Sequence, residues 1–133
     1  MARPPFLTQT QREARQQLVN SAPRVEDHAG VREVGVALEF SDPEGKQHPS
    51  PRAVAYAAQS HAYFEFGCPM QDCRGGGFDA NADLQPALAK RRNGHTGVLN
   101  CHGVRPRSGF KNAQCNIALT YTLAIRAKAM VTA

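Results

Sequence analysis

The sequence predicts an α+β fold in which an antiparallel sheet of four or five strands packs with one main helix, preceded by an N-terminal helical arm. Three observations support this prediction. Residues 34–40 and 115–125 alternate apolar residues with small or polar ones, a period of two that is typical of strands with one buried face. Residues 83–93 begin with a capping residue and end before a glycine, as a helix does. A length of 133 residues suits one domain.

The N-terminal arm, residues 1–30, is rich in Gln, Arg and Pro, and its apolar residues are scattered. A short helix is expected from Gln11 to Asn20, with Thr10 and Glu13 at the spacing of a capping box. Such a helix has too few apolar side chains to be stable by itself. We therefore expect the arm to be partly helical or mobile, and residues 31–129 to form the single domain.

The domain begins with the strand around Val34 to Phe40, and a turn containing Pro43 and Gly45 follows. A second strand is expected between Arg52 and Ala58. The next strand places Ala62, Phe64, Phe66 and Cys68 on one face.

The main helix is expected from Asp83 to Asn93. Asn81 or Asp83 could cap it, and Pro86 favours Asp83 because proline is tolerated only near the start of a helix. Gly94 would end it.

Two more strands follow the helix, one around residues 98–103 and one from Cys115 to Ile125, which has the strictest alternation in the sequence. About a dozen residues connect them, so the simplest arrangement is an antiparallel hairpin.

All four cysteines lie within residues 61–115, as Cys68, Cys73, Cys101 and Cys115. The first two form a C-x4-C loop, and the hairpin could bring the other two to the same point. Zinc prefers four thiolates in a tetrahedron, and in a reducing compartment thiols bind metal more often than they form structural disulfides. We therefore predict one structural Zn²⁺ that stabilises the fold.

This arrangement resembles the generic zinc-ribbon class of four-cysteine zinc-binding domains, over about residues 61–125. One ligand pair comes from a tight loop and the other from a later hairpin. The first pair departs from the usual C-x2-C spacing, and the second is spaced far more widely than such a pair, so no specific family is indicated. The resemblance implies a closed structural zinc site.

Other interpretations of the cysteines remain open. They could be buried free thiols, form disulfides, or perform redox chemistry with Cys68 as attacker and Cys73 as resolver. His102 or His61 could replace a cysteine as ligand. Neighbouring residues on a strand point to opposite sides, which favours His102 as a surface residue beside Cys101.

The sequence carries neither the motif of a zinc deaminase nor that of a phosphate-binding loop. His61 and Glu65 do not have the His-x-Glu spacing of zinc deaminases, and the loop Arg74 to Gly77 lacks the Gly-Lys-Ser/Thr ending of a phosphate loop. Four thiolates would also leave no open position on the metal. We therefore predict a non-catalytic protein, with no small-molecule substrate evident.

The net charge of +5 favours an anionic partner such as nucleic acid. A basic patch near the metal is the candidate surface for it, made of Arg74, Lys90, Arg91, Arg92, Arg105, Arg107 and Lys111. For the three residues at 90–92 there is a simpler explanation, because cations in the last turn of a helix complement its dipole.

The alternative function is a protein-interaction or scaffold module with purely structural zinc. Its contact surface would be the arm or an exposed sheet edge, including a homodimer through the strand from Cys115 to Ile125. The N-terminal sequence lacks the apolar run of a signal peptide, and no segment has the length of apolar sequence that crosses a bilayer. A cytoplasmic protein without membrane contact is therefore expected.

Overall fold

The computed structural model describes residues 9–107 and 110–127, except for the side chains of residues 106–112, and it has the predicted α+β fold. Its main sheet is antiparallel, with the strand order β2-β1-β8-β5. The strands of this sheet are β1 (Val31–Ser41), β2 (Arg52–Tyr56), β5 (Thr96–Asn100) and β8 (Ala118–Ala127). The two small sheets pair β3 (Glu65–Phe66) with β4 (Phe78–Asp79) and β6 (Val104–Arg107) with β7 (Phe110–Gln114).

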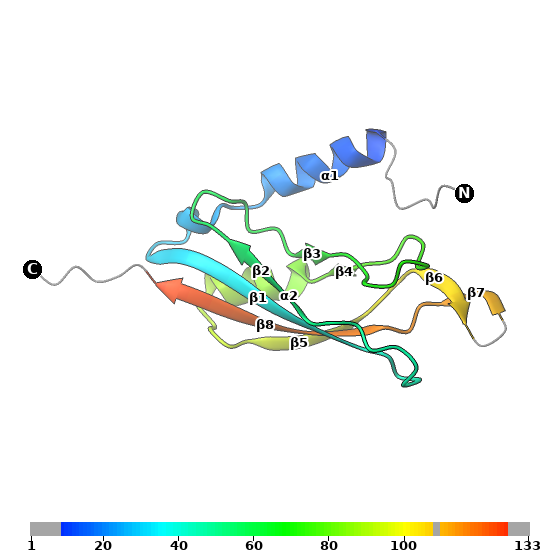
Figure 1. The fold of residues 1–133 in the computed structure, drawn as a ribbon. Coiled ribbons are helices and arrows are strands. Elements are labelled where there is room, and N and C mark those ends of the chain that lie inside the picture. Colours follow the sequence, from blue (N-terminus) through cyan, green and yellow to red (C-terminus); the bar gives the residue numbers. More distant parts are fainter. Residues whose placement is uncertain (1–8, 108–109, 128–133) are drawn as a thin grey trace, which may run out of the picture.

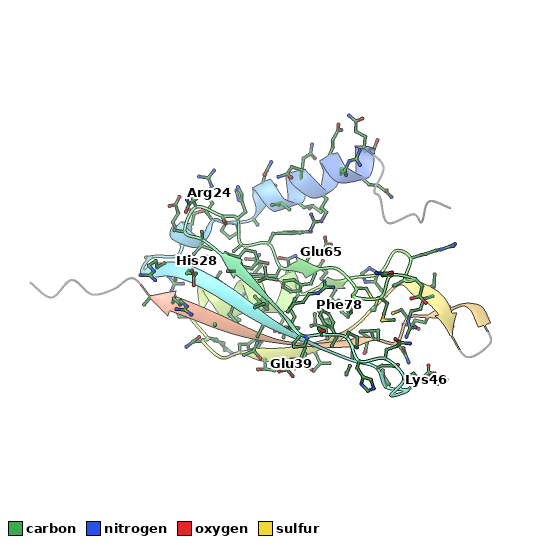
Figure 2. The ribbon with its side chains drawn as sticks, viewed as in Figure 1. Arg24, His28, Glu39, Lys46, Glu65 and Phe78 are labelled. Carbon is green, nitrogen blue, oxygen red and sulfur yellow. The ribbon has the colours of Figure 1, made fainter. Side chains whose placement is uncertain are left out.

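The elements form layers on one side of the main sheet. In Figure 1 the sheet crosses the lower part of the view, with helix α2 (Asn81–Ala89) behind it, β3 and β4 above it, and helix α1 (Gln9–Ser21) at the top. Figure 2 shows Glu65 beside α1, Phe78 in the interior, and Glu39 on the side of the sheet away from α1. The core therefore lies between the sheet and the layer that contains α2.

The two long strands β1 and β8 explain the strict alternation in the sequence, because each buries every second side chain in the core. Val34 and Val36 of β1 and Leu119 and Leu123 of β8 are all at most 1% exposed. β8 lies between β1 and β5, so both of its edges are paired. The expectation that this strand offers an exposed edge to a second copy is therefore wrong, since the edges of the sheet are β2 and β5.

The segment before the first cysteine is extended, but only Glu65 and Phe66 belong to a strand. Other backbone groups of this segment form hydrogen bonds that do not belong to a sheet. The Phe64 N–H donates to Asn81 Oδ1 at 2.8 Å, and the Ala62 N–H donates to the Pro23 carbonyl at 2.8 Å. The predicted alternation of side chains is nevertheless confirmed. Ala62, Phe64 and Phe66 are buried in the core.

The antiparallel pairing of the last two predicted strands is confirmed, because β5 pairs with β8 from Thr96 opposite Thr122 to Asn100 opposite Ala118. The connection between them is itself a hairpin of β6 and β7. Cys101 and Cys115 lie at the base of this inserted hairpin, just outside β5 and β8.

Helix α2 starts two residues earlier and ends four residues earlier than predicted. Neither Asn81 nor Asp83 caps it, because the N-cap position is Ala80 and has no side-chain cap bond. Its end is set by Arg91, which has a left-handed φ of 57° and whose guanidinium donates to the Leu88 carbonyl at 3.1 Å. This bond satisfies a carbonyl that a longer helix would use internally.

The predicted arm helix is confirmed as α1, although Thr10 lies inside it and does not cap it. No residue of α1 is buried, and Leu18 is 57% exposed. Arg15 attaches the helix through an ion pair with Glu65 at 2.7 Å and a cation–π contact with Tyr63. No helix in the described part of the chain is long and apolar enough to span a bilayer.

Candidate metal centre

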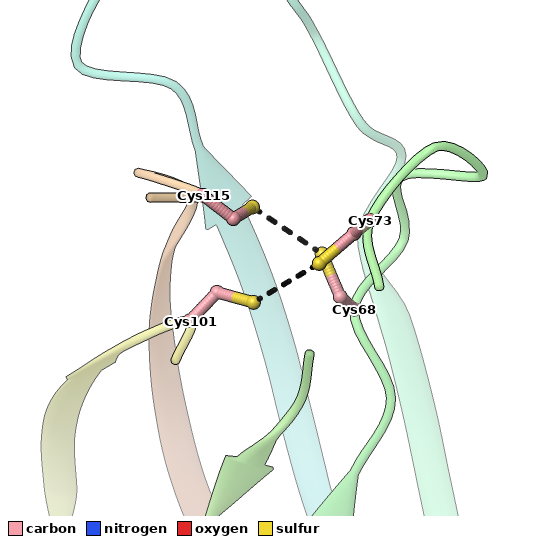
Figure 3. Close-up of side chains that lie close together, drawn as sticks. All are labelled: Cys68, Cys73, Cys101 and Cys115. Atoms are coloured by element: carbon pink, nitrogen blue, oxygen red, sulfur yellow. Dashed lines mark hydrogen bonds between the residues drawn. The ribbon is translucent and has the colours of Figure 1, made fainter. Parts of the chain in front are cut away.

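The four predicted cysteine ligands converge on one point (Figure 3). Their sulfur atoms all lie within 4.8 Å of one another, and the Cys68–Cys115 and Cys73–Cys101 pairs are 3.8 and 3.5 Å apart. A tetrahedron with zinc–sulfur bonds of about 2.3 Å has edges of about 3.8 Å. The spacing therefore fits a single metal ion, and it is far beyond the ~2.05 Å of a disulfide bond.

Three separate segments position these sulfurs. Cys68 and Cys73 come from the loop between β3 and β4, Cys101 follows β5 directly, and Cys115 lies between β7 and β8. The antiparallel pairing of β5 and β8 continues past the ends of both strands, because the Cys101 N–H donates to the Ile117 carbonyl at 3.0 Å. Sheet pairing thus brings together cysteines that are distant in the sequence.

Backbone N–H groups point at three of the four sulfurs, each from two residues further along the chain. Met70 donates to Cys68, Gly103 donates to the sulfur of Cys101 at 3.4 Å, and Ile117 donates to Cys115. A hydrogen bond to an ionised acceptor is stronger than one to a neutral acceptor, so these donors favour thiolates over thiols. The local turns are therefore built to hold negatively charged sulfur.

Burial alone would oppose that ionisation. Cys101 and Cys115 are fully buried and Cys68 and Cys73 are half-buried. Burial raises the pKa of Cys68 to about 12 and also raises that of Cys73. At Cys115 burial also acts to raise the pKa, but the Ile117 N–H, the Arg105 guanidinium and the neighbouring thiols outweigh it. Four thiolates this close together need a cation among them, which a metal ion would supply.

Arg105 contributes to the cysteine cluster, although the sequence interpretation placed it in an exposed basic patch. Its side chain is only 6% exposed, and its guanidinium hydrogen-bonds to the sulfur of Cys115 and donates to Asn116 Oδ1 at 3.1 Å. Burial acts to lower the pKa of Arg105, but Cys115 and the carboxylates of Asp72 and Asp42 raise it overall. A buried guanidinium is costly without a counter-charge, so its position indicates an anionic sulfur cluster.

Two glycines enclose the cluster at distances that exclude any side chain. A Cβ on Gly76 would overlap the sulfur of Cys73 and lie 2.7 Å from that of Cys101. A Cβ on Gly103 would lie 2.6 Å from the sulfur of Cys73 and 2.5 Å from the Cα of Gly76. The sequence interpretation used the glycine run only as a turn, and the glycine two residues after Cys101 was the signal it missed.

Neither histidine considered as a substitute ligand belongs to the cluster. His102 is exposed, and His61 donates from Nδ1 to the Ala22 carbonyl at 2.7 Å. Among the described residues, the metal-binding group consists of the four cysteines.

The members of the predicted basic patch whose side chains are described lie in different places. Lys90, Arg91 and Arg92 follow α2, near the point where the Gly94 N–H donates to the carbonyl of Leu123. At ~3.3 Å per strand residue, this point is about 20 Å along the strand from Ile117, whose carbonyl accepts from Cys101. Arg74 is exposed beside the cluster, whereas the side chains of Arg107 and Lys111 lie outside the described residues.

A second polar cluster joins α2 to the sheet and is formed by Asp83, His95 and Tyr121. Tyr121 donates from its hydroxyl to Asp83 Oδ2, and His95 Nε2 lies 2.9 Å from the same oxygen. The hydrogen bond from Tyr121 is the main reason that the pKa of Asp83 falls below its ordinary value, although burial opposes it. This cluster explains why Asp83 does not cap the helix.

We predict that Tyr121→Phe raises the pKa of Asp83 toward its ordinary value and lowers stability at pH 7 by about 1 kcal/mol, because Asp83 is partly exposed. Since the folded pKa of Asp83 is depressed, its contribution is complete above about pH 4 and is lost as the pH falls toward the folded pKa. An NMR titration of the Asp83 carboxyl carbon, with urea unfolding at pH 7, measures both effects. A normal pKa for Asp83 in the parent protein would contradict this prediction.

The cysteine cluster could bind a metal ion, and its geometry is the strongest functional feature of the described residues. Comparisons with protein-family models, with curated proteins and with solved structures found no match to this chain.

Proposed function

We propose that this chain is a non-catalytic binding protein whose fold depends on one structural Zn²⁺ held by Cys68, Cys73, Cys101 and Cys115. The convergence of the four sulfurs, all within 4.8 Å of one another, carries the proposal. The backbone donors to three sulfurs and the buried guanidinium of Arg105 support it, because both stabilise negative charge on the cluster.

The donor set favours zinc over other metals. Thiolates are soft ligands and select zinc, copper(I) or iron, whereas calcium and magnesium require oxygen ligands. A tetrahedral set of four thiolates is typical of structural zinc, and it leaves no position on the metal for water or substrate. A cytoplasmic location is consistent with four reduced cysteines.

Elemental analysis of the purified protein tests the proposal directly. We expect one zinc per chain after gel filtration, and less than one in Cys73→Ser, which retains the other three ligands. Iron with acid-labile sulfide in place of zinc would contradict the assignment. Alkylation with iodoacetamide should be slow until a chelator is added, whereas rapid modification of Cys68 in the zinc-loaded protein would favour the thiol redox alternative.

Nucleic-acid binding is the second candidate function, and the net charge of +5 favours it. Because Arg105 is buried against Cys115, it cannot serve in such a surface, and Arg74 is the exposed cation with a described side chain at the metal site. We predict that affinity for a single-stranded oligonucleotide falls steeply with salt. If the nucleic acid binds beside the metal, Arg74→Ala should weaken binding strongly. Replacing both Lys90 and Arg92 by Ala should weaken it less.

A fluorescence-anisotropy titration at about 50 and about 200 mM salt measures this binding. The double substitution is the matched control, because Lys90 and Arg92 are exposed at the far end of the sheet. Binding that does not change with salt, or is equally strong in all three proteins, would reject nucleic acid as the partner of this site.

A further inference from the structure

The face of the main sheet that points away from α2 has a composition unlike that of an ordinary solvent-exposed sheet. Its centre is formed by Ala53 of β2, Gly35, Ala37 and Glu39 of β1, Thr120, Thr122 and Ala124 of β8, and Val98 of β5. Register places Ala53 opposite Ala37, Ala37 opposite Thr122, and Gly35 opposite Ala124. We call this surface the open face.

No described element covers the open face, because α1, α2, β3 and β4 all lie on the other side of the sheet (Figure 1). Ala37, Ala53 and Ala124 are exposed, and Val98 is 63% exposed. An antiparallel sheet with one face in water normally alternates core residues with polar or charged ones. Here, apart from Glu39, the water-facing positions at the centre are uncharged, and most of them are alanine, glycine or threonine, in a chain with a net charge of +5.

The size of these side chains suits contact with another sheet. Two sheets that pack face to face lie about 10 Å apart, and small side chains allow them to approach at least that closely over their whole width. With ~3.3 Å per residue and ~4.8 Å between strands, the strands present about 500 Å² on this face. Two copies would bury about 1,000 Å², which reaches the lower limit of a specific interface.

The charged residues at one end of the open face can pair with the same residues of a second copy. Glu33 of β1 and Arg126 of β8 are opposite each other in the register and form an ion pair at 3.1 Å. A two-fold axis that runs along the strands between β1 and β8 places the β1 of one copy over the β8 of the other. Each Glu33 then faces the partner subunit's Arg126, and the interface has two oppositely charged pairs.

We propose that the open face binds the open face of a second copy of this chain around that axis, so that the protein is a homodimer. Nucleic acid is a poor occupant, because the centre of the face offers neither cations for phosphates nor aromatic rings for bases. The same lack of cations excludes an anionic lipid surface. This interface does not involve the cysteine cluster, so its failure and the failure of the zinc proposal are distinguishable.

Charge reversal tests the axis. Glu33→Arg places two guanidinium groups together across the interface, and Arg126→Glu places two carboxylates together, so each variant alone should dissociate with a constant about a hundredfold higher. Mixing the two variants restores oppositely charged pairs between subunits, and we expect the mixture to form heterodimers. Analytical ultracentrifugation of the zinc-loaded full-length proteins measures all three samples. Association of each variant alone as strong as that of the parent would overturn the proposed axis.

A second substitution tests the centre of the face. Ala37→Arg adds a long cation beside the two-fold axis at a position that is exposed in the single chain, so it should abolish the dimer without loss of zinc or of the circular dichroism spectrum. Gln59→Arg, at an exposed turn away from the open face, is the matched control and should remain dimeric. A parent protein that is monomeric at a concentration of about 100 μM, or an Ala37→Arg variant that still dimerises, would overturn the proposal.

Discussion

Removal of zinc with a chelator is expected to unfold this protein at room temperature. Structural zinc contributes an apparent free energy on the order of 10 kcal/mol, while a small domain has a net stability of about 5–15 kcal/mol. Cys101 and Cys115 are fully buried, and the metal would tie the β5 and β8 ends to the loop before β4. Without the metal these thiolates must be protonated or separated, and the buried Arg105 then loses the largest part of its counter-charge, which Cys115 supplies.

Circular dichroism and urea unfolding, before and after chelation, measure this effect. We expect loss of most strand signal in the apo protein and its recovery on addition of one equivalent of Zn²⁺, with Mg²⁺ as the control that fails to restore it. Cys101→Ser should behave like the apo protein, since serine oxygen is a poor zinc ligand and the position is buried. An apo protein with an unchanged urea midpoint would show that zinc has no structural role.

Gly76→Ala is expected to abolish zinc binding and to destabilise the fold by nearly as much as chelation does. The new methyl group would occupy the space of the Cys73 sulfur and approach that of Cys101 within 2.7 Å, so the four sulfurs could not keep tetrahedral spacing. Gly103 packs against the backbone of Gly76, and it prevents the loop from moving away to make room. Metal content by elemental analysis and thermal unfolding by circular dichroism measure the loss.

Gly67→Ala is the matched control for this substitution. Gly67 lies directly before Cys68, yet a Cβ there meets no atom within 4 Å, and its φ lies outside the left-handed region. It should retain one zinc per chain and change stability by less than about 1 kcal/mol. If Gly76→Ala also bound one zinc with normal affinity, the close packing around the sulfurs would not be required for the site.

The sequence predicted the long strands β1 and β8 more accurately than the extended segment around Phe64. The alternation in β1 and β8 directly reflects burial, because each long strand is paired on both sides and has one face in the core. The segment around Phe64 has the same alternation of burial but almost no ladder, since Asn81 and Pro23 supply hydrogen-bond partners that periodicity does not reveal. A pattern of period two reports which face is buried, and it does not report which strands are paired.

The sequence by itself determined the number and chemistry of the candidate ligands, because side-chain type is a local property and four cysteines allow few chemical interpretations. Only the tertiary structure decided that their sulfurs meet, that Arg105 faces Cys115 and not solvent, and that the basic residues after α2 lie at the far end of the sheet. It also decided that Asp83 binds Tyr121 and that β8 is internal. These features depend on contacts between residues distant in the chain, and such contacts follow from sheet order and register, which no local spacing encodes.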